Sequence, residues 1–349
     1  MPTAKVGFFP LSEQLQVVEE HISPGVARHA VWLAGLVPYD QAAAILAQIG
    51  GMAVSASTIW RRLQLRGGEF AAQEAHEGTQ AQALPEKWAP PSRAEASDQR
   101  MGVGLDGFMV NIIDEGWKEL KLGVVFDLAL RSGRDERTGE RGLVAHAVNN
   151  TYAAHLGGPE VFGESVFAEA RRRGWERAQD TQAIGDGAAW IWNQVGLHFG
   201  ASRQLVDWYH AKQHLATAAR CYKGEGTPAA TLWLNSRETA LYQGHAARIA
   251  GELEQATPAK PEWAEDLRRE AGYFRQHQQR MNYLEMREED WVLGSGMVEG
   301  GAKRYQARLC GPGMRWSRKG AENITPIRTA ILSGRFDERW RATQKLPPA

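Results

Sequence analysis

Cysteine is almost absent from this chain, which has two in 349 residues, Cys221 and Cys310. Two cysteines cannot build a disulfide framework or a zinc site. The sequence also has no run of 18 or more apolar residues, so no segment predicts a transmembrane helix. Its opening residues, MPTAKVGFFPLS, are too short and too polar for a signal peptide. We therefore expect a cytoplasmic protein without a membrane partner.

An excess of positive charge is missing as well, because 41 lysines and arginines balance 41 aspartates and glutamates. This balance argues against a simple nucleic-acid binder, which usually carries a basic excess, and leaves DNA contact to local basic clusters. Apolar residues are abundant, at 43% of the chain. At this length they suit two or three folding units.

The first 68 residues predict a helical region. Apolar residues at helical spacing predict helices over 40–49 and 58–65, and a glycine pair follows each. Such a pair is typical of a helix-turn-helix, whose second helix would present Arg61, Arg62 and Arg66 to DNA. The alternative is an ordinary helical hairpin with a solvated basic face. Residues 69–99 are polar and contain three prolines, and we expect a linker there.

The pattern then changes to strands. Three strand patterns follow one another after short turns, and strands and helices alternate after them. The expected elements are strands over 101–113, 120–130, 142–148, 182–185 and 203–207 and helices over 159–173, 188–199 and 210–221. This order matches the ribonuclease H-like α/β fold, a mixed five-stranded sheet whose first three strands are antiparallel and whose others are parallel.

The same patterns set the domain boundaries that we expect after the N-terminal region (1–68) and the linker (69–99). A catalytic core would occupy 100–222 and return over 293–342. An all-α insertion over 223–292, rich in alanine and charged residues, would interrupt the core, and 343–349 would be a tail.

Three carboxylates stand at informative places: Asp106 within an apolar strand, Asp186 after the fourth strand, and Glu299 in the first turn of a late helix. Each has an ordinary explanation, as a satisfied core aspartate, a helix N-cap and a favourable charge at a helix N-terminus. In the expected sheet, however, the fourth strand lies beside the first. Asp106 and Asp186 would then repel each other unless a cation lies between them. Divalent metal ions do this in phosphoryl chemistry.

Two histidines follow the fifth strand, at His210 and His214. Their spacing places them on one helix face, as in a zinc pair, but no third ligand accompanies them. We expect instead that His210 forms hydrogen bonds within the core and braces the site, with Asp207 as an auxiliary residue.

A basic segment follows Glu299. Between residues 300 and 320 there are six basic residues and no acid, with aromatic residues interleaved, as contact with phosphates and unpaired bases requires. The expected DNA-binding residues are Lys303, Arg304, Arg308, Arg315, Trp316, Arg318 and Lys319. A solvated helix face is the alternative.

Together with the triad, five motifs resemble those of the ISKra-type insertion-sequence transposases, a group of DDE transposases. They are DGAAWIW at 186–192, DWYH at 207–210, GSGMVE at 294–299, GMRWS at 313–317 and GRFDERW at 334–340. The resemblance covers about residues 10–342. One departure is that relatives often carry a cysteine-rich ribbon before the helix-turn-helix, whereas this chain has no cysteine before Cys221.

The resemblance implies that Asp106, Asp186 and Glu299 bind two Mg²⁺ or Mn²⁺ ions per active site. The protein would then cleave and join DNA strands at the ends of an insertion sequence, as a homo-oligomer on double-stranded transposon and target DNA. It would work in the bacterial cytoplasm, associated with the nucleoid. A domesticated, inactive relative that only binds DNA is the alternative. A glycosidase would need only a carboxylate pair, and the basic segment argues against it.

Overall fold

The computed structural model describes residues 22–82, 97–135 and 137–343, and the chain contacts divide into two compact units. The first unit comprises 1–76, 110–118 and 304–349, and the second comprises 77–109 and 119–303. Residues from 304 onward thus group with the N-terminal helices, whereas the sequence predicts one continuous return over 293–342. Within the described residues, no helix is both long and apolar enough to cross a membrane.

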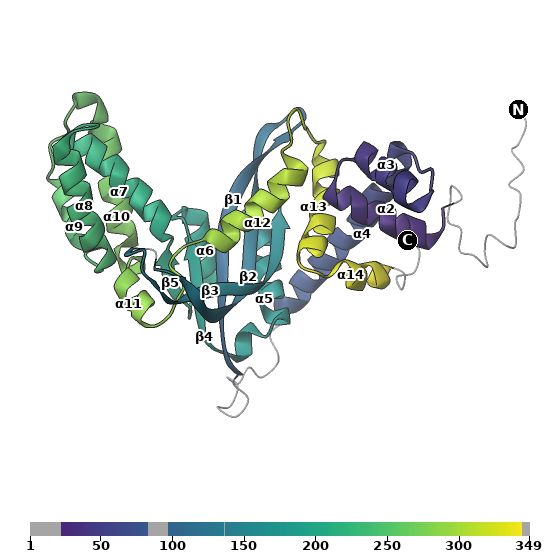
Figure 1. Ribbon diagram of the computed structural model, residues 1–349, viewed down its shortest axis with the longest axis horizontal. Helices are drawn as coiled ribbons and strands as arrows, with labels where there is room; N and C mark the ends of the chain where they lie inside the picture. Colours follow the sequence, from purple (N-terminus) through teal and green to yellow (C-terminus); the bar gives the residue numbers. More distant parts are fainter. Residues whose placement is uncertain (1–21, 83–96, 136, 344–349) are drawn as a thin grey trace, which may run out of the picture. The chain divides into compact units, whose positions relative to one another are not determined.

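The first unit is helical. Its described helices are α2 (Pro24–Leu36), α3 (Tyr39–Gly50), the first part of α4 (Ala56–Gln82), α13 (Arg318–Leu332) and α14 (Phe336–Thr343). Helix α2 packs against both α3 and α13 (Figure 1). Gly35 makes the second of these contacts close, because a Cβ there would lie 2.5 Å from the Ile331 side chain. The N-terminal and C-terminal parts of the chain therefore share one core.

Helix α4 corrects the predicted end of the second helix at the glycine pair. It continues through Gly67 and Gly68 to Gln82, so 69–82 is helix and not linker, and 83–96 lies outside the described residues. Position 67 requires glycine because another helix packs closely against it, and not because the helix ends there. A Cβ at this position would lie 2.1 Å from the backbone oxygen of Asn323 in α13.

The second unit contains a mixed five-stranded sheet in the order β3-β2-β1-β4-β5. Its strands are β1 (Ser97–Ile112), β2 (Gly116–Arg134), β3 (Arg141–His155), β4 (Ala178–Gly185) and β5 (Arg203–Val206), all but β5 extending beyond the segments expected from the sequence. Strands β2 and β3 pair antiparallel, and β4 pairs parallel with β1 and β5. The expectation that the fourth strand lies beside the first is confirmed.

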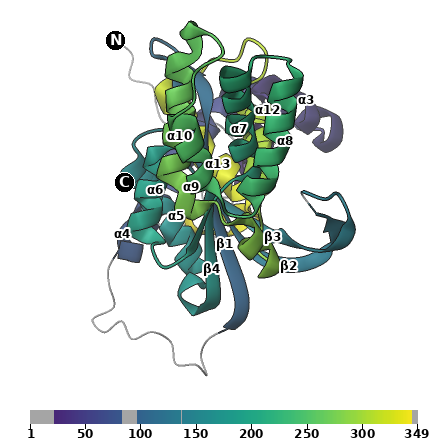
Figure 2. The same ribbon diagram turned by 90° about the vertical axis from the view of Figure 1, so that its left-hand side faces the viewer.

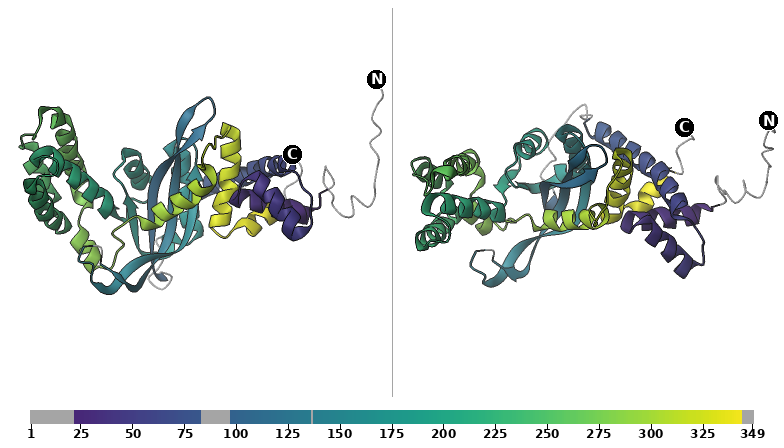
Figure 3. Two further views of the ribbon diagram at one scale, coloured as in Figure 1. Left: turned by 45° about the horizontal axis from the view of Figure 1, so that its top comes forward. Right: turned by 90° about the horizontal axis from the view of Figure 1, so that it is seen from above.

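Helices cover both faces of this sheet. They are α5 (Pro159–Arg172) and α6 (Ala189–His198) on one face and the start of α12 (Gly296–Leu309) on the other, as Figure 3 shows from above. Glycines permit the close contacts: a Cβ at Gly123 would meet Val166 of α5 at 2.5 Å, and one at Gly104 would meet Val298 of α12 at 2.4 Å. Asp106 lies two residues after Gly104 on β1, and side chains alternate between faces along a strand. Asp106 therefore lies on the face that α12 covers.

Beyond the β5 edge, α7 (Trp208–Lys223) packs with the predicted helical insertion (Figures 1 and 2). The insertion comprises α8 (Pro228–Tyr242), α9 (Ala246–Glu254), α10 (Ala264–His277) and α11 (Tyr283–Glu288). Helix α10 contacts both α7 and α9. The insertion thus rests on the helix that begins directly after the sheet, which brings α10 to the same sheet edge as Asp186.

Candidate active site

Strand register brings the two aspartates to one edge of the sheet. Leu105 of β1 pairs with Gly185 of β4, and Asp106 and Asp186 are the next residues on these neighbouring strands. Neighbouring strands lie about 4.8 Å apart. The two carboxylates therefore start from adjacent backbone positions, although 80 residues separate them in the chain (186 − 106).

Asp106 is a carboxyl group in an unfavourable environment. Its Oδ1 accepts a 2.7 Å hydrogen bond from the Gly107 amide, and no lysine or arginine among the described residues forms an ion pair with it. Burial raises the pKa of Asp106 to about 6, and the charges of Asp186 and Glu299 add to this effect, while the Gly107 amide and His210 oppose it. The three predicted carboxylates are therefore near enough to act on one another.

Asp186 accepts two hydrogen bonds in the turn that follows β4, one at its side chain and one at its backbone oxygen. Its Oδ1 accepts a 2.8 Å hydrogen bond from the Ala188 amide within this turn, but the N-cap of α6 is Ala188, so Asp186 does not cap the helix. Its backbone oxygen accepts a 2.9 Å hydrogen bond from the Tyr273 hydroxyl of α10. Gly187 has φ +121°, and a Cβ there would meet the Tyr273 ring at 2.7 Å. Glycine is needed both for the backbone conformation and for the space.

Sequence reasoning missed the contribution of α10. The Tyr273 ring stacks on His214 with centroids 3.6 Å apart, and His214 Nδ1 lies 2.6 Å from the buried carboxylate of Glu270. His277 packs beside Tyr273, and burial lowers its pKa to about 4. No local signal marks these residues, because their partners are distant in the chain. His214 therefore pairs with Glu270, while His210 pairs with Asp207.

Asp207 holds the segment that precedes the third carboxylate, Glu299. It is fully buried at the end of β5, where it caps α7 by accepting a 2.7 Å hydrogen bond from the His210 amide, and its other oxygen accepts from the Ser295 amide. The adjacent Trp208 amide donates to the Leu293 oxygen at 3.0 Å. These bonds fix the segment directly before α12, whose first turn carries Glu299.

The same hydrogen bonds shift the pKa values of Asp207 and His210. Burial alone would raise the pKa of Asp207, but hydrogen bonds from His210 and Ser295 outweigh it and lower that pKa. The hydrogen bond to Asp207 raises the pKa of His210. His210 is thus hydrogen-bonded to a buried side chain, as a bracing role would require.

The donor chemistry of the three carboxylates fits hard divalent cations, which prefer oxygen ligands. None of the three forms an ion pair with lysine or arginine in the described part of the chain, and His210 is the group whose charge opposes the rise in the Asp106 pKa. As the side chains stand, no group of three or more histidine, cysteine, aspartate or glutamate residues in 22–82, 97–135 and 137–343 is placed to hold a metal ion.

Three of the residues expected to contact DNA are buried, and this corrects the prediction. Arg62 is 9% exposed, Arg308 1% and Trp316 7%. Arg308 donates to the backbone oxygen of Ala34 and lies over the Trp316 ring, while the Trp316 indole donates to the Leu309 oxygen. Arg308 and Trp316 thus donate to backbone oxygens inside the first unit, and all three side chains are largely withdrawn from solvent.

The other basic residues divide into two groups. Arg66 and Arg318 form ion pairs with Glu69 and Glu115. The residues that remain exposed are Arg61, Lys303, Arg304, Arg315 and Lys319. The exposed group is the part of the predicted DNA-binding set that is still available to solvent.

Comparison with known proteins adds no relative to this picture. No protein-family model matches the chain, and the search of curated proteins finds no significant match.

Proposed function

We propose that this protein is a DDE transposase that cleaves and joins DNA strands at an active site formed by Asp106, Asp186 and Glu299. The observation that carries the proposal is the register of β1 and β4, which places the two aspartates side by side where β4 ends and its parallel pairing with β1 stops. Ligands of open α/β sheets bind at such edges. The Asp207–Ser295 hydrogen bond supports the delivery of Glu299 to the same edge.

The resident metals would be Mg²⁺ or Mn²⁺, two per site. When bound, they supply activation of the attacking oxygen and stabilisation of the leaving oxygen. Asp106 would contribute to both ions, and Asp186 and Glu299 would each complete one. Asp207 holds the segment before Glu299, and the Tyr273 hydroxyl holds the turn that carries Asp186. No serine or tyrosine nucleophile is needed, because water or a DNA 3′-hydroxyl attacks the phosphorus.

The rest of the proposal follows from the motif resemblance. The sheet would be ribonuclease H-like, with α7–α11 as its helical elaboration, and α3 and α4 would form a helix-turn-helix. The partners would be double-stranded DNA and further copies of this chain, in the cytoplasm of a bacterium. Arg61 is the exposed arginine of the three on α4, which makes it the best candidate there for DNA contact.

Nicking of supercoiled plasmid tests the catalytic part. We expect Mg²⁺-dependent nicking by the wild type and a loss of at least about 100-fold in Asp106→Asn, Asp186→Asn and Glu299→Gln, because each removes a charged ligand of the metal ions that would stabilise the transition state by several kcal/mol. Asp180→Asn is the matched control. Asp180 is an exposed aspartate on β4, and no charged partner holds it within the described residues.

Nicking that persists in EDTA, or that survives all three substitutions, would reject the proposed site. Tight DNA binding by a wild type that never nicks DNA would support the inactive relative instead.

A further inference from the structure

A second site lies in the first unit, at a cavity of about 500 Å³ beside Trp117. We propose that this cavity binds a single unpaired nucleotide of a DNA strand, with its base on the Trp117 ring and its phosphate on Arg315. The inference rests on the proposed function for its ligand, DNA, but it concerns binding and not cleavage. The cavity is lined by Asn111, Trp117, Cys310, Gly311, Pro312, Gly313, Met314 and Arg315.

Trp117 is the aromatic face of this site. It follows the tight turn at Asp114–Gly116, where both residues have positive φ, and it is 61% exposed. Within the described residues, the ring stacks on no other aromatic ring and lies under no cation. An indole left this open is costly in water, and a partner that covers it would gain favourable contact area.

The opposite wall is a well-anchored loop. The Trp316 amide donates to the Asn111 oxygen at 3.0 Å, and the Ile113 amide donates to the Trp316 oxygen at 2.8 Å. The buried Trp316 indole bonds to Leu309, and a turn from Gly311 to Met314 closes with a 2.9 Å hydrogen bond. The cavity is therefore preformed, which lowers the entropic cost of binding.

The charges around the cavity favour an anion. Arg315 is exposed and forms no ion pair within the described residues. The neighbouring acid, Glu115, is already held by Arg318 and lies 4.0 Å from Lys118. No acidic residue lines the cavity. A free guanidinium therefore faces an approaching phosphate without a competing carboxylate, and the Asn111 amide can bond to a base edge.

The size and shape select one nucleotide over a base-pair stack. Ligand cavities of about 300–1,000 Å³ suit small organic groups, and a base can reach the Trp117 ring only after it leaves its duplex. Unpaired bases stack on aromatic side chains irrespective of sequence. Strand cleavage and joining create unpaired nucleotides at strand ends, so a site for one fits the proposed reaction.

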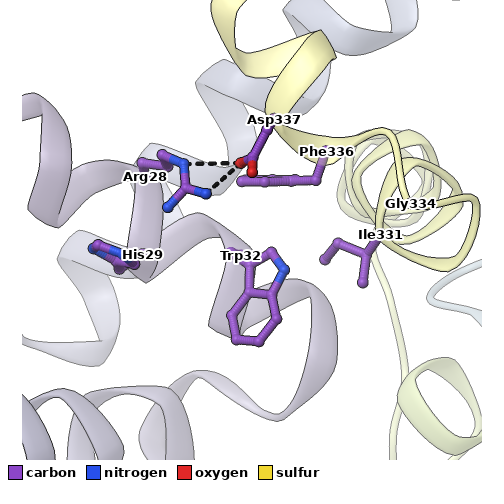
Figure 4. Close-up of a pocket in the computed structure, with 7 residues that line it drawn as sticks. All are labelled: Arg28, His29, Trp32, Ile331, Gly334, Phe336 and Asp337. Carbon is purple, nitrogen blue, oxygen red and sulfur yellow. Dashed lines mark hydrogen bonds and ion pairs between the residues drawn. The ribbon is translucent and has the colours of Figure 1, made fainter.

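A second cavity in the first unit, beside Trp32, differs from the Trp117 cavity in the charge that it offers. Trp32 is 38% exposed beside a cavity of about 360 Å³ that Arg28, His29 and Phe336 also line (Figure 4). There the guanidinium of Arg28 is engaged by Asp337, as the dashed lines show. Because its cation is already compensated, this cavity offers an exposed tryptophan without an available charge, and Trp32→Ala is a matched control.

The experiment measures DNA binding by fluorescence anisotropy with the full-length protein in EDTA, which prevents cleavage. The two probes are a fully paired duplex and the same duplex with one unpaired thymine. We expect the wild type to bind the second probe about 10-fold more tightly, since stacking of one base contributes about that factor. Trp117→Ala should abolish this preference, Trp117→Phe should keep most of it, and Trp32→Ala should leave it unchanged.

Quenching of a 2-aminopurine at the unpaired position gives an independent readout of stacking. It should appear with the wild type and Trp117→Phe and be lost in Trp117→Ala, each checked for a normal thermal melt. An unchanged preference in Trp117→Ala, or an equal loss in Trp32→Ala, overturns the proposal. Displacement of the probe by stoichiometric thymidine monophosphate also overturns it, because the site would then serve free nucleotides.

Catalysis is judged separately, by nicking. A protein that prefers the unpaired probe but never nicks plasmid would reject the proposed catalysis and support the nucleotide site. One that nicks plasmid without the preference would do the opposite.

Discussion

At the scale of single residues, the buried carboxyl group of Asp106 lowers the stability of the folded protein when it is ionised and no cation is bound. Burial and two neighbouring carboxylates raise its pKa to about 6. The folded protein without metal therefore holds a proton at Asp106 at pH values where the unfolded chain has already released it. A cation at the site would replace that proton and remove the repulsion.

The consequence for stability has a definite sign. Because the folded pKa of Asp106 lies above the usual value of 3.8, its contribution is most favourable below about pH 4 and is lost as the pH rises through 6. Asp106→Asn should therefore stabilise the metal-free protein by about 2 kcal/mol at pH 8 relative to its effect at pH 4. Thermal melts in EDTA at the two pH values measure this difference.

Asp180→Asn is the control for this measurement, because Asp180 is exposed on β4. A stabilisation by Asp106→Asn that is equal at both pH values would contradict a raised pKa.

At the scale of elements, the glycine pair in α4 separates two roles that look identical in the sequence. Gly67 faces the backbone oxygen of Asn323 at a distance that excludes a Cβ, whereas a Cβ at Gly68 would have its nearest contact 3.9 Å away, at the Asn323 side chain. Both lie in the interior of one long helix. Only the packing partner, more than 250 residues later in the chain, distinguishes them.

Adjacent substitutions should therefore have opposite effects. Gly67→Ala should lower the midpoint of thermal unfolding, because α4 and α13 must move apart at a cost of about 1–3 kcal/mol. Gly68→Ala should raise it, because alanine stabilises a helix interior by about 0.5–1 kcal/mol relative to glycine. Calorimetry of the two variants decides the matter. Destabilisation by both would fit a helix that ends at the pair, as the sequence pattern suggests.

Strands and their order are the part of the fold that local patterns predict well. The apolar run around Asp106 and the strand before Asp186 predict buried strands. The match of the element order to the ribonuclease H-like fold predicts that these two strands are neighbours. The contacts of Tyr273, Asp207 and Gly67 are different in kind. Each depends on a partner from a distant segment, and residue type alone does not identify that partner. The burial of Arg308 was hidden for the same reason, because its acceptor is a backbone oxygen of Ala34.

At the scale of the whole molecule, the net charge is zero and few of the residues predicted to contact DNA are exposed. Five of the ten residues predicted to contact DNA are exposed, namely Arg61, Lys303, Arg304, Arg315 and Lys319. Each phosphate contact contributes about 0.9 to the slope of log affinity against log salt concentration. DNA affinity should therefore fall with a slope of about 4 to 5 and not near the value of about 8 expected if all nine predicted basic residues contacted phosphates.

Single substitutions refine this prediction. Lys319→Ala should reduce the slope by about 1, while Arg308→Ala should leave it unchanged, because Arg308 is buried. Anisotropy titrations between low and physiological potassium chloride measure both. A slope that drops with Arg308→Ala would mean that this side chain reaches DNA after all.

The hydrogen bond between Asp207 and the Ser295 amide joins two residues that a ribosome adds to the chain at different times. A ribosome makes both aspartates of the sheet long before it reaches Ser295 and Glu299, so a nascent chain holds an incomplete set of acidic groups while it is still tethered. Asp207 can accept its hydrogen bond from the Ser295 amide only after the ribosome has added the 88 residues that follow Asp207. Under the proposed function, cleavage at this edge would need Glu299, so it would begin only after most of the polypeptide has been translated.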